Sequence, residues 1–106
     1  MSAERRYSRH QIGSTAEFLV EGEYFSGIVV NSSLGGIALE LEKNVPSEVF
    51  VGSTLDIRLY DIYSDMKYPY PAKVARKSGK ELAVEFLQPL TENQEIFLKR
   101  WLEWQE

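Results

Sequence analysis

The sequence predicts an all-β domain followed by one α-helix. Between residues 12 and 87, short segments of alternating apolar and polar residues recur, and turn-forming residues separate them. The spacing of apolar residues then becomes helical over residues 91–105. Since no helical pattern lies between the strands, we expect six strands in an antiparallel barrel or sandwich and not a parallel α/β sheet.

The composition is that of a single ordinary globular domain spanning residues 1–106. Of the 106 residues, 43% are hydrophobic and 26% are charged, which suffices for one core. The sequence contains no apolar run of about eighteen residues and begins with polar residues, so we expect no membrane insertion, no signal peptide and a cytoplasmic location. The absence of cysteine excludes disulfides and thiolate chemistry.

The barrel is expected over residues 12–88, with its first strand at residues 12–21. The apolar residues of this strand fall on one face: Ala16, Phe18 and Val20. A turn at residues 22–23 leads to the second strand, residues 24–30, in which Gly27 marks either a bulge or a close packing contact.

The third and fourth strands, residues 37–42 and 55–60, alternate most clearly, and a loop at residues 43–52 joins them. Carboxylates occupy outward positions of the strands, where we expect solvent to cover them: Glu17, Glu40 and Asp56.

Residues 61–71 contain three tyrosines and two prolines. We expect a long exposed connection or a ragged edge strand, whose aromatic rings cover the mouth of the barrel or stay half exposed. Contact of these rings with a partner is the alternative. The last two strands follow at residues 72–77 and 81–87, joined by a turn at residues 78–79.

The terminal helix is expected over residues 91–105. Thr91 and Gln94 have the spacing of a capping box, and Pro89 precedes them. The apolar residues at helical spacing form one face: Phe97, Leu98, Trp101, Leu102 and Trp104. We expect this face to cover the barrel; docking on another protein or on a second copy is the alternative.

Two polar stretches are candidates for binding. Residues 31–36 read Asn-Ser-Ser-Leu-Gly-Gly and connect the second and third strands; such a run makes a hairpin turn, and its glycines also permit close approach of a ligand. Residues 1–11 form a basic arm on a chain of net charge -4. Arginine suits phosphates and the O6 and N7 edge of guanine, so a small anionic ligand fits better than a nucleic-acid polymer. A solvated basic terminus is the alternative.

The two stretches together resemble the paired signature of the PilZ domain family, receptors for the bacterial second messenger cyclic di-GMP. The first motif is Arg-x-x-x-Arg at Arg5 and Arg9, and the second is Asn-x-Ser-x-x-Gly at Asn31, Ser33 and Gly36. The resemblance covers nearly the whole chain. It implies a six-stranded antiparallel barrel capped by the helix, with the two arginines on the phosphates and a guanine edge of the ligand and the second motif holding a guanine.

The resemblance implies a cytoplasmic receptor that is not an enzyme. The sequence has no metal-ligand spacing, so we expect no metal and no further cofactor. Arg6 and Gly35 are candidates for additional ligand contacts. The family often has Asp where this chain has Asn31, and the neutral amide is expected to lower the affinity. Residues 1–11 are expected to be a flexible arm that orders on binding and relays the signal to an unidentified protein partner.

Other functions have weaker support in the sequence. The main alternative is a PilZ-like interaction module that binds no nucleotide, but such modules usually lack one of the motifs. A barrel that binds single-stranded nucleic acid needs interleaved basic and aromatic residues, and Lys67 is the only basic residue between positions 60 and 70. Catalysis has little support because His10 is the only histidine. The downstream pathway, ligand stoichiometry and oligomeric state stay open.

Overall fold

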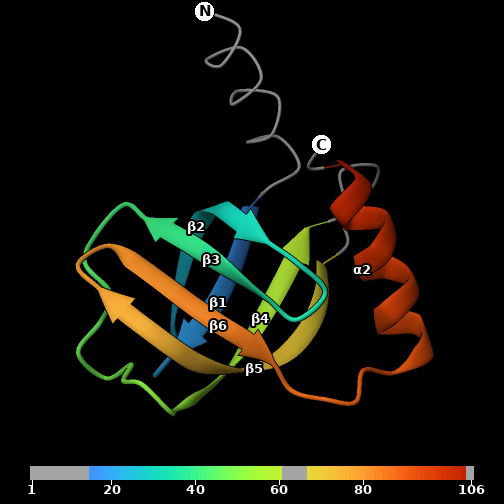
Figure 1. Cartoon of the computed structure of the whole chain (residues 1–106). Helices are drawn as coiled ribbons and strands as arrows, with labels where there is room; N and C mark the ends of the chain where they lie inside the picture. Colours follow the sequence, from blue (N-terminus) through green and yellow to red (C-terminus); the bar gives the residue numbers. More distant parts are fainter. Residues whose placement is uncertain (1–14, 61–66, 105–106) are drawn as a thin grey trace, which may run out of the picture.

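Six strands close into an antiparallel barrel in the order β1-β2-β3-β6-β5-β4, and one helix lies beside it (Figure 1). The structure is a computed structural model that describes residues 15–60 and 67–104. Its elements are β1 (Thr15–Val20), β2 (Glu23–Ser32), β3 (Gly36–Leu41), β4 (Thr54–Tyr60), β5 (Lys67–Ser78), β6 (Glu81–Phe86) and α2 (Glu92–Trp104). The predicted six-stranded barrel with a C-terminal helix is confirmed. The expected arm, with Arg5, Arg6, Arg9 and His10, lies outside the described residues.

The core fills the barrel with alternate residues of every strand. Ala16 and Phe18 of β1 are fully buried, as their spacing predicts, and Val20 packs against the same core. Each fully buried side chain of the size of Leu or Phe contributes roughly 1.5–3 kcal/mol of hydrophobic stabilisation. This alternation leaves the other half of the strand residues on the outer surface, where the candidate site lies.

Two hairpin turns lie one residue away from their predicted positions. The β1–β2 turn is formed by Glu21 and Gly22, both with positive φ (49° and 86°), and the β5–β6 turn by Gly79 and Lys80. Two-residue hairpins whose twist matches the strands need residues that accept positive φ. The predicted turns at residues 22–23 and 78–79 are therefore wrong by one position.

Residues 67–71 are the first part of β5 and pair with β4 but not with β6, so the expected edge strand is confirmed for them and the expected exposed connection is wrong. Tyr70 is fully buried in the core, so the expectation that the tyrosines stay at the mouth or half exposed is wrong for this residue. The two prolines fit because their carbonyls point away from β4. That of Pro71 accepts from the Leu87 amide at 2.9 Å and that of Pro69 from the Gln94 side chain at 3.1 Å. A missing N–H on that side breaks no β4 ladder bond.

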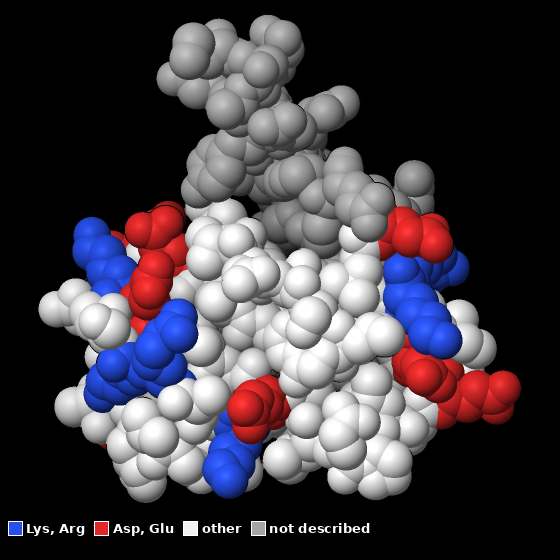
Figure 2. All heavy atoms as spheres, in the orientation of Figure 1, with Lys and Arg blue, Asp and Glu red and all other residues white. Residues whose placement is uncertain are grey.

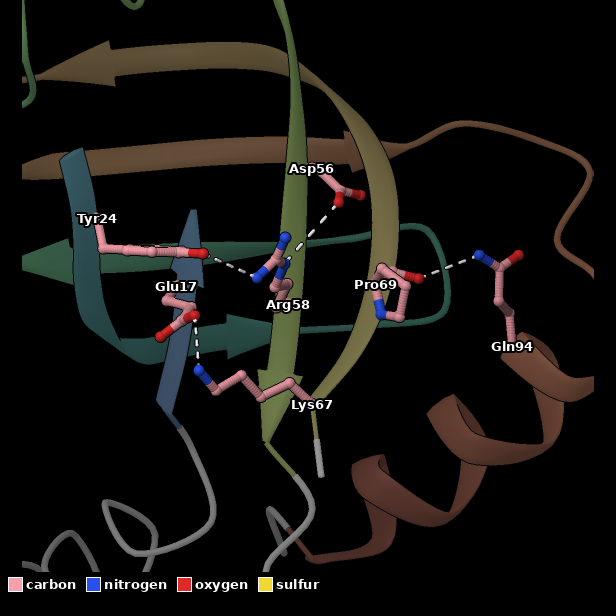
Figure 3. Close-up of polar contacts among 7 residues, drawn as sticks. All are labelled: Glu17, Tyr24, Asp56, Arg58, Lys67, Pro69 and Gln94. Carbon is pink, nitrogen blue, oxygen red and sulfur yellow. Dashed lines mark hydrogen bonds and ion pairs between the residues drawn. The ribbon is translucent and has the colours of Figure 1, made fainter. Parts of the chain in front are cut away.

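The helix begins with the predicted capping box. The Gln94 amide donates to the Thr91 hydroxyl at 3.1 Å, and the Thr91 amide donates to the Gln94 side-chain oxygen at 2.9 Å. Phe97, Leu98 and Trp101 are buried against the barrel, and the contact between Gln94 and β5 is visible in Figure 3. The apolar face of α2 therefore covers the barrel, as predicted, although the side chain of Trp104 is outside the described part. No helix of that part is long and apolar enough to span a membrane.

Candidate functional site

A groove of about 670 Å³ crosses the outer face of the barrel where β2 ends and β3 begins. All four predicted site residues that the structure describes line it: Asn31, Ser33, Gly35 and Gly36. The opposite side belongs to β5, β6 and the segment after β6, which contribute Arg76, Glu85 and Gln88. On the face seen in Figure 2, charged side chains gather toward the edges and leave the centre mostly uncharged.

The stretch from Asn31 to Gly36, which contains the second motif, is only partly a turn. Asn31 and Ser32 belong to β2 and Gly36 opens β3, so residues 33–35 alone make the connection, and the prediction of a turn over residues 31–36 is wrong at both ends. The Ser33 hydroxyl oxygen accepts a hydrogen bond from the Gly35 amide at 3.1 Å. The Gly35 carbonyl in turn accepts from the Phe86 amide at 2.9 Å. The connection is therefore fixed to β6. Because the Ser33 hydroxyl acts as an acceptor in this turn, its hydrogen can donate to a further group.

Gly36 is required by the packing of β3 on β6. A Cβ atom on this residue would overlap the carbonyl oxygen of Val84 and lie 3.1 Å from Cα of Glu85. Close packing also requires glycine at position 27, since a Cβ there would lie 2.7 Å from a methyl carbon of Leu41. Of the two expectations for Gly27, close packing is therefore confirmed and the bulge is not; the bulge of β2 lies between Val29 and Asn31.

Two β-bulges, one on each side of the groove, determine which side chains face it. In β2 the extra residue is Val30, which follows buried Val29 and precedes exposed Asn31. In β5 the register shifts between buried Val74 and exposed Arg76. Strict alternation would turn both Asn31 and Arg76 toward the core, because they lie two residues after an inward-facing valine. The bulges keep both side chains on the surface.

One row of outward-facing residues crosses four neighbouring strands in register: Asn31, Ala38, Ala83 and Arg76. Three strand spacings separate the ends of the row, so the Cα atoms of Asn31 and Arg76 are about 14 Å apart at most. The two alanines between them have only methyl side chains and leave a shallow floor. A planar ring system can lie on this floor between an amide at one end and a guanidinium at the other.

Sequence reasoning missed the β5 and β6 side of the groove. Arg76, Glu85 and Gln88 carry no local motif, and their position depends on strand pairing between distant segments. The available signal was the pair of alanines at outward strand positions, Ala38 and Ala83, since each is followed two residues on, at the next outward position of the same strand, by a glutamate.

A second polar cluster lies on β1, β4 and β5 (Figure 3). Glu17 is only 6% exposed, and its carboxylate accepts hydrogen bonds from the Tyr60 hydroxyl at 2.5 Å and from Lys67 Nζ at 3.0 Å. The expectation of a solvated carboxylate is therefore wrong for Glu17, whereas Glu40 and Asp56 are exposed as predicted. Partner groups from two strands cover this carboxylate.

The hydrogen bonds of this cluster decide the charge state of Glu17. Burial alone would raise its pKa, but the hydrogen bonds from Tyr60 and Lys67 and the positive charges of Lys67 and Arg58 together outweigh burial and leave the pKa lowered. The bond to Glu17 also raises the pKa of both Tyr60 and Lys67. The charges of Glu17 and Lys67 compensate each other. The cluster therefore connects β1 to β4 and β5. Within residues 15–60 and 67–104, no three acidic or histidine side chains come together to hold a metal ion.

Comparisons with known proteins agree with this architecture. Residues 3–104 match the family model described as the PilZ domain. The PilZ domain of CeSA from a cellulose-synthesizing bacterium has a similar structure, with a TM-score of 0.62 and 18% identity, covering 82% of this chain and 86% of that one. The PilZ domain of YcgR from Escherichia coli, solved with c-di-GMP, has a TM-score of 0.69 and 18% identity, covering 82% of this chain and 76% of that one. Among curated proteins, none matches this chain in sequence.

Proposed function

Because the chain belongs to the PilZ domain family, we propose that it is a cytoplasmic receptor for cyclic di-GMP and not an enzyme. The observation that carries this proposal is that the described members of the second motif, Asn31, Ser33 and Gly36, line one groove. The similar fold of a PilZ domain solved with c-di-GMP supports the same ligand class.

The chemistry of the groove suits a guanine base. The Watson–Crick edge of guanine carries the N1 and N2 donors, and the Asn31 side-chain oxygen is an acceptor at one end of the groove. The Ser33 hydroxyl can donate to the ligand while it accepts from the Gly35 amide. Gly36 keeps β3 close to β6, so the alanine floor is continuous beneath the purine.

The length of the chain allows the first motif to reach the groove. Thr15, the first residue of β1, pairs with Ile28 of β2, and Asn31 follows Ile28 in the same strand. Three strand residues span about 10 Å, whereas the six residues from Arg9 to Thr15 span up to about 20 Å when extended. In the proposed complex, Arg5 and Arg9 bind the phosphates and a guanine edge, and Arg6 is an additional candidate.

Ordering of residues 1–11 around the ligand is the proposed switch. An arm that becomes ordered presents a new surface without any large change in the barrel, and a protein partner reads that surface. Amide hydrogen exchange with and without saturating cyclic di-GMP tests this step. Equal exchange of residues 1–11 in both states would contradict it.

Isothermal titration tests the proposed receptor directly. Cyclic di-GMP is titrated into the wild-type protein, Arg9→Ala and the control Lys99→Ala, which removes the same charge from an exposed position on α2; GTP is the control ligand. We expect micromolar or tighter binding that Arg9→Ala abolishes and Lys99→Ala retains. Absence of binding to the wild-type protein, by calorimetry and by a second method such as equilibrium dialysis, would overturn the proposal.

A further inference from the structure

The far side of the groove has its own charged group. Among the described residues that line the groove, Arg76 alone is positively charged. Its side chain is 64% exposed, and its ion-pair partner is Glu81, whose carboxylate oxygen lies 4.0 Å from a guanidinium nitrogen. An exposed pair at this distance holds the side chain only weakly. The guanidinium is therefore available to a ligand in the groove.

Arg76 and Asn31 occupy equivalent positions at the two ends of the groove. The two residues end the same cross-strand row, each directly follows a β-bulge, and only Ala38 and Ala83 lie between them. A guanine on this floor that turns its Watson–Crick edge toward Asn31 has its N7 and O6 edge at about a right angle to that edge, within reach of the long side chain of Arg76.

The two edges of guanine match these two side chains. The N1 and N2 donors suit the Asn31 oxygen, and the N7 and O6 acceptors suit the fork of an arginine, which binds them through two parallel hydrogen bonds. Glu85 also lines the groove and projects outward from β6 one outward position beyond Ala83. Its carboxylate disfavours a phosphate at this end and leaves an uncharged base edge as the better partner for Arg76.

We propose that Arg76 is a specificity-determining ligand contact, which binds the N7 and O6 edge of the guanine whose other edge faces Asn31. The proposal rests on the proposed function and adds a residue outside both sequence motifs. It predicts that recognition of guanine depends on β5 as well as on the motif after β2.

The test compares two ligands and four proteins by calorimetry. The ligands are cyclic di-GMP and its analogue in which 7-deazaguanine replaces both guanines, which removes the N7 acceptor. The proteins are wild type, Arg76→Ala, Arg76→Lys and Lys73→Ala. Lys73 is the matched control because it is an exposed cation on the same strand that does not line the groove. Thermal unfolding of each variant confirms that it is folded.

We expect Arg76→Ala to weaken binding of cyclic di-GMP about 10- to 100-fold, as loss of a two-bond base contact does, and Lys73→Ala to change it less than twofold. The wild-type preference for cyclic di-GMP over the deaza analogue should shrink at least threefold in Arg76→Ala. Arg76→Lys should not restore affinity, because an ammonium lacks the planar fork.

Three results would overturn the proposal while leaving the proposed receptor intact. They are unchanged affinity in Arg76→Ala, an undiminished preference for cyclic di-GMP over the analogue, and full rescue by Arg76→Lys, which would indicate a phosphate contact instead. Absence of cyclic di-GMP binding to the wild-type protein would overturn both.

Discussion

The hydroxyl of Tyr70, a fully buried residue of β5, donates a hydrogen bond of 2.7 Å to the main-chain carbonyl of Gln94 in the first turn of α2. The side chain of Gln94 also donates to the carbonyl of Pro69 at 3.1 Å. The first turn of the helix is thus tied to β5 by two hydrogen bonds on adjacent residues. Burial raises the pKa of Tyr70, so the phenol remains a neutral donor throughout the physiological range.

Replacing Tyr70 with phenylalanine should lower the free energy of unfolding by about 1 kcal/mol, because the substitution removes one hydrogen bond and leaves the Gln94 carbonyl without that donor. Urea denaturation measures the change. Tyr68→Phe is the control: Tyr68 packs on Phe97, with ring centroids 4.8 Å apart, but its hydroxyl makes no hydrogen bond to any described residue. Equal losses in the two variants would show that the bond contributes nothing.

Glu17→Gln should destabilise the protein at pH 7 and much less at acidic pH. The pKa of Glu17 is lower in the folded protein than its ordinary value of 4.5, so the carboxylate stabilises the fold above that pH. This contribution is lost as the pH falls through the folded pKa. Urea denaturation of wild type and variant from pH 7 to pH 3 measures the gap between them.

The control for this pH dependence is Glu40→Gln, at an exposed position of β3. We expect little change in unfolding free energy for this variant. A gap between wild type and Glu17→Gln that stays constant with pH would contradict the role assigned to the Glu17 carboxylate.

Gly36→Ala should lower the free energy of unfolding by about 2 kcal/mol, since the new methyl group must push β3 away from the Val84 carbonyl. Gly35→Ala is the matched comparison one residue earlier. A Cβ there meets nothing closer than the Ser33 hydroxyl oxygen at 3.8 Å, so the variant should be close to wild type in a thermal melt. Similar melting temperatures for both variants would refute the packing explanation for Gly36.

Asn31→Asp should tighten binding of cyclic di-GMP about fivefold, because hydrogen bonds to a charged acceptor are about twice as strong as neutral ones. Calorimetric titration measures the dissociation constants. Asn44→Asp adds the same charge at an exposed loop position and should bind no more tightly than wild type. Weaker binding by Asn31→Asp would place the ligand phosphates, and not a guanine donor edge, beside this residue.

The sequence predicts those features of the fold that depend on neighbours along the chain. The alternation around Phe18 and the reciprocal cap between Thr91 and Gln94 are of this kind, and both are confirmed. The start of β5 was not predictable in the same way. Proline is tolerated at positions 69 and 71 only because the main-chain carbonyls of these residues, and with them the side of the missing N–H, point away from β4, and that depends on strand pairing.

In the candidate site, too, residues of a local motif are predictable from the sequence and residues that depend on strand pairing are not. Asn31, Ser33 and Gly36 are recognisable because they form a local motif, and the structure brings them into one groove. Arg76 belongs to the groove through the β3–β6 and β5–β6 pairings. Neither bulge has a distinctive composition, so the outward direction of Asn31 and Arg76 required the register of the strands.

The two bulges also bear on which changes of the chain such a groove tolerates in evolution. Exchanging Val30 for another side chain leaves the strand register, and hence the direction of Asn31, unchanged. Deleting its codon removes the extra residue of β2 and makes the pairs Val29–Leu39 and Asn31–Ala38 consecutive, so Asn31 still points outward; the same holds for Ala75 and Arg76 in β5. Relatives of this chain can therefore gain or lose either extra residue and still keep an outward-facing side chain at each end of the groove.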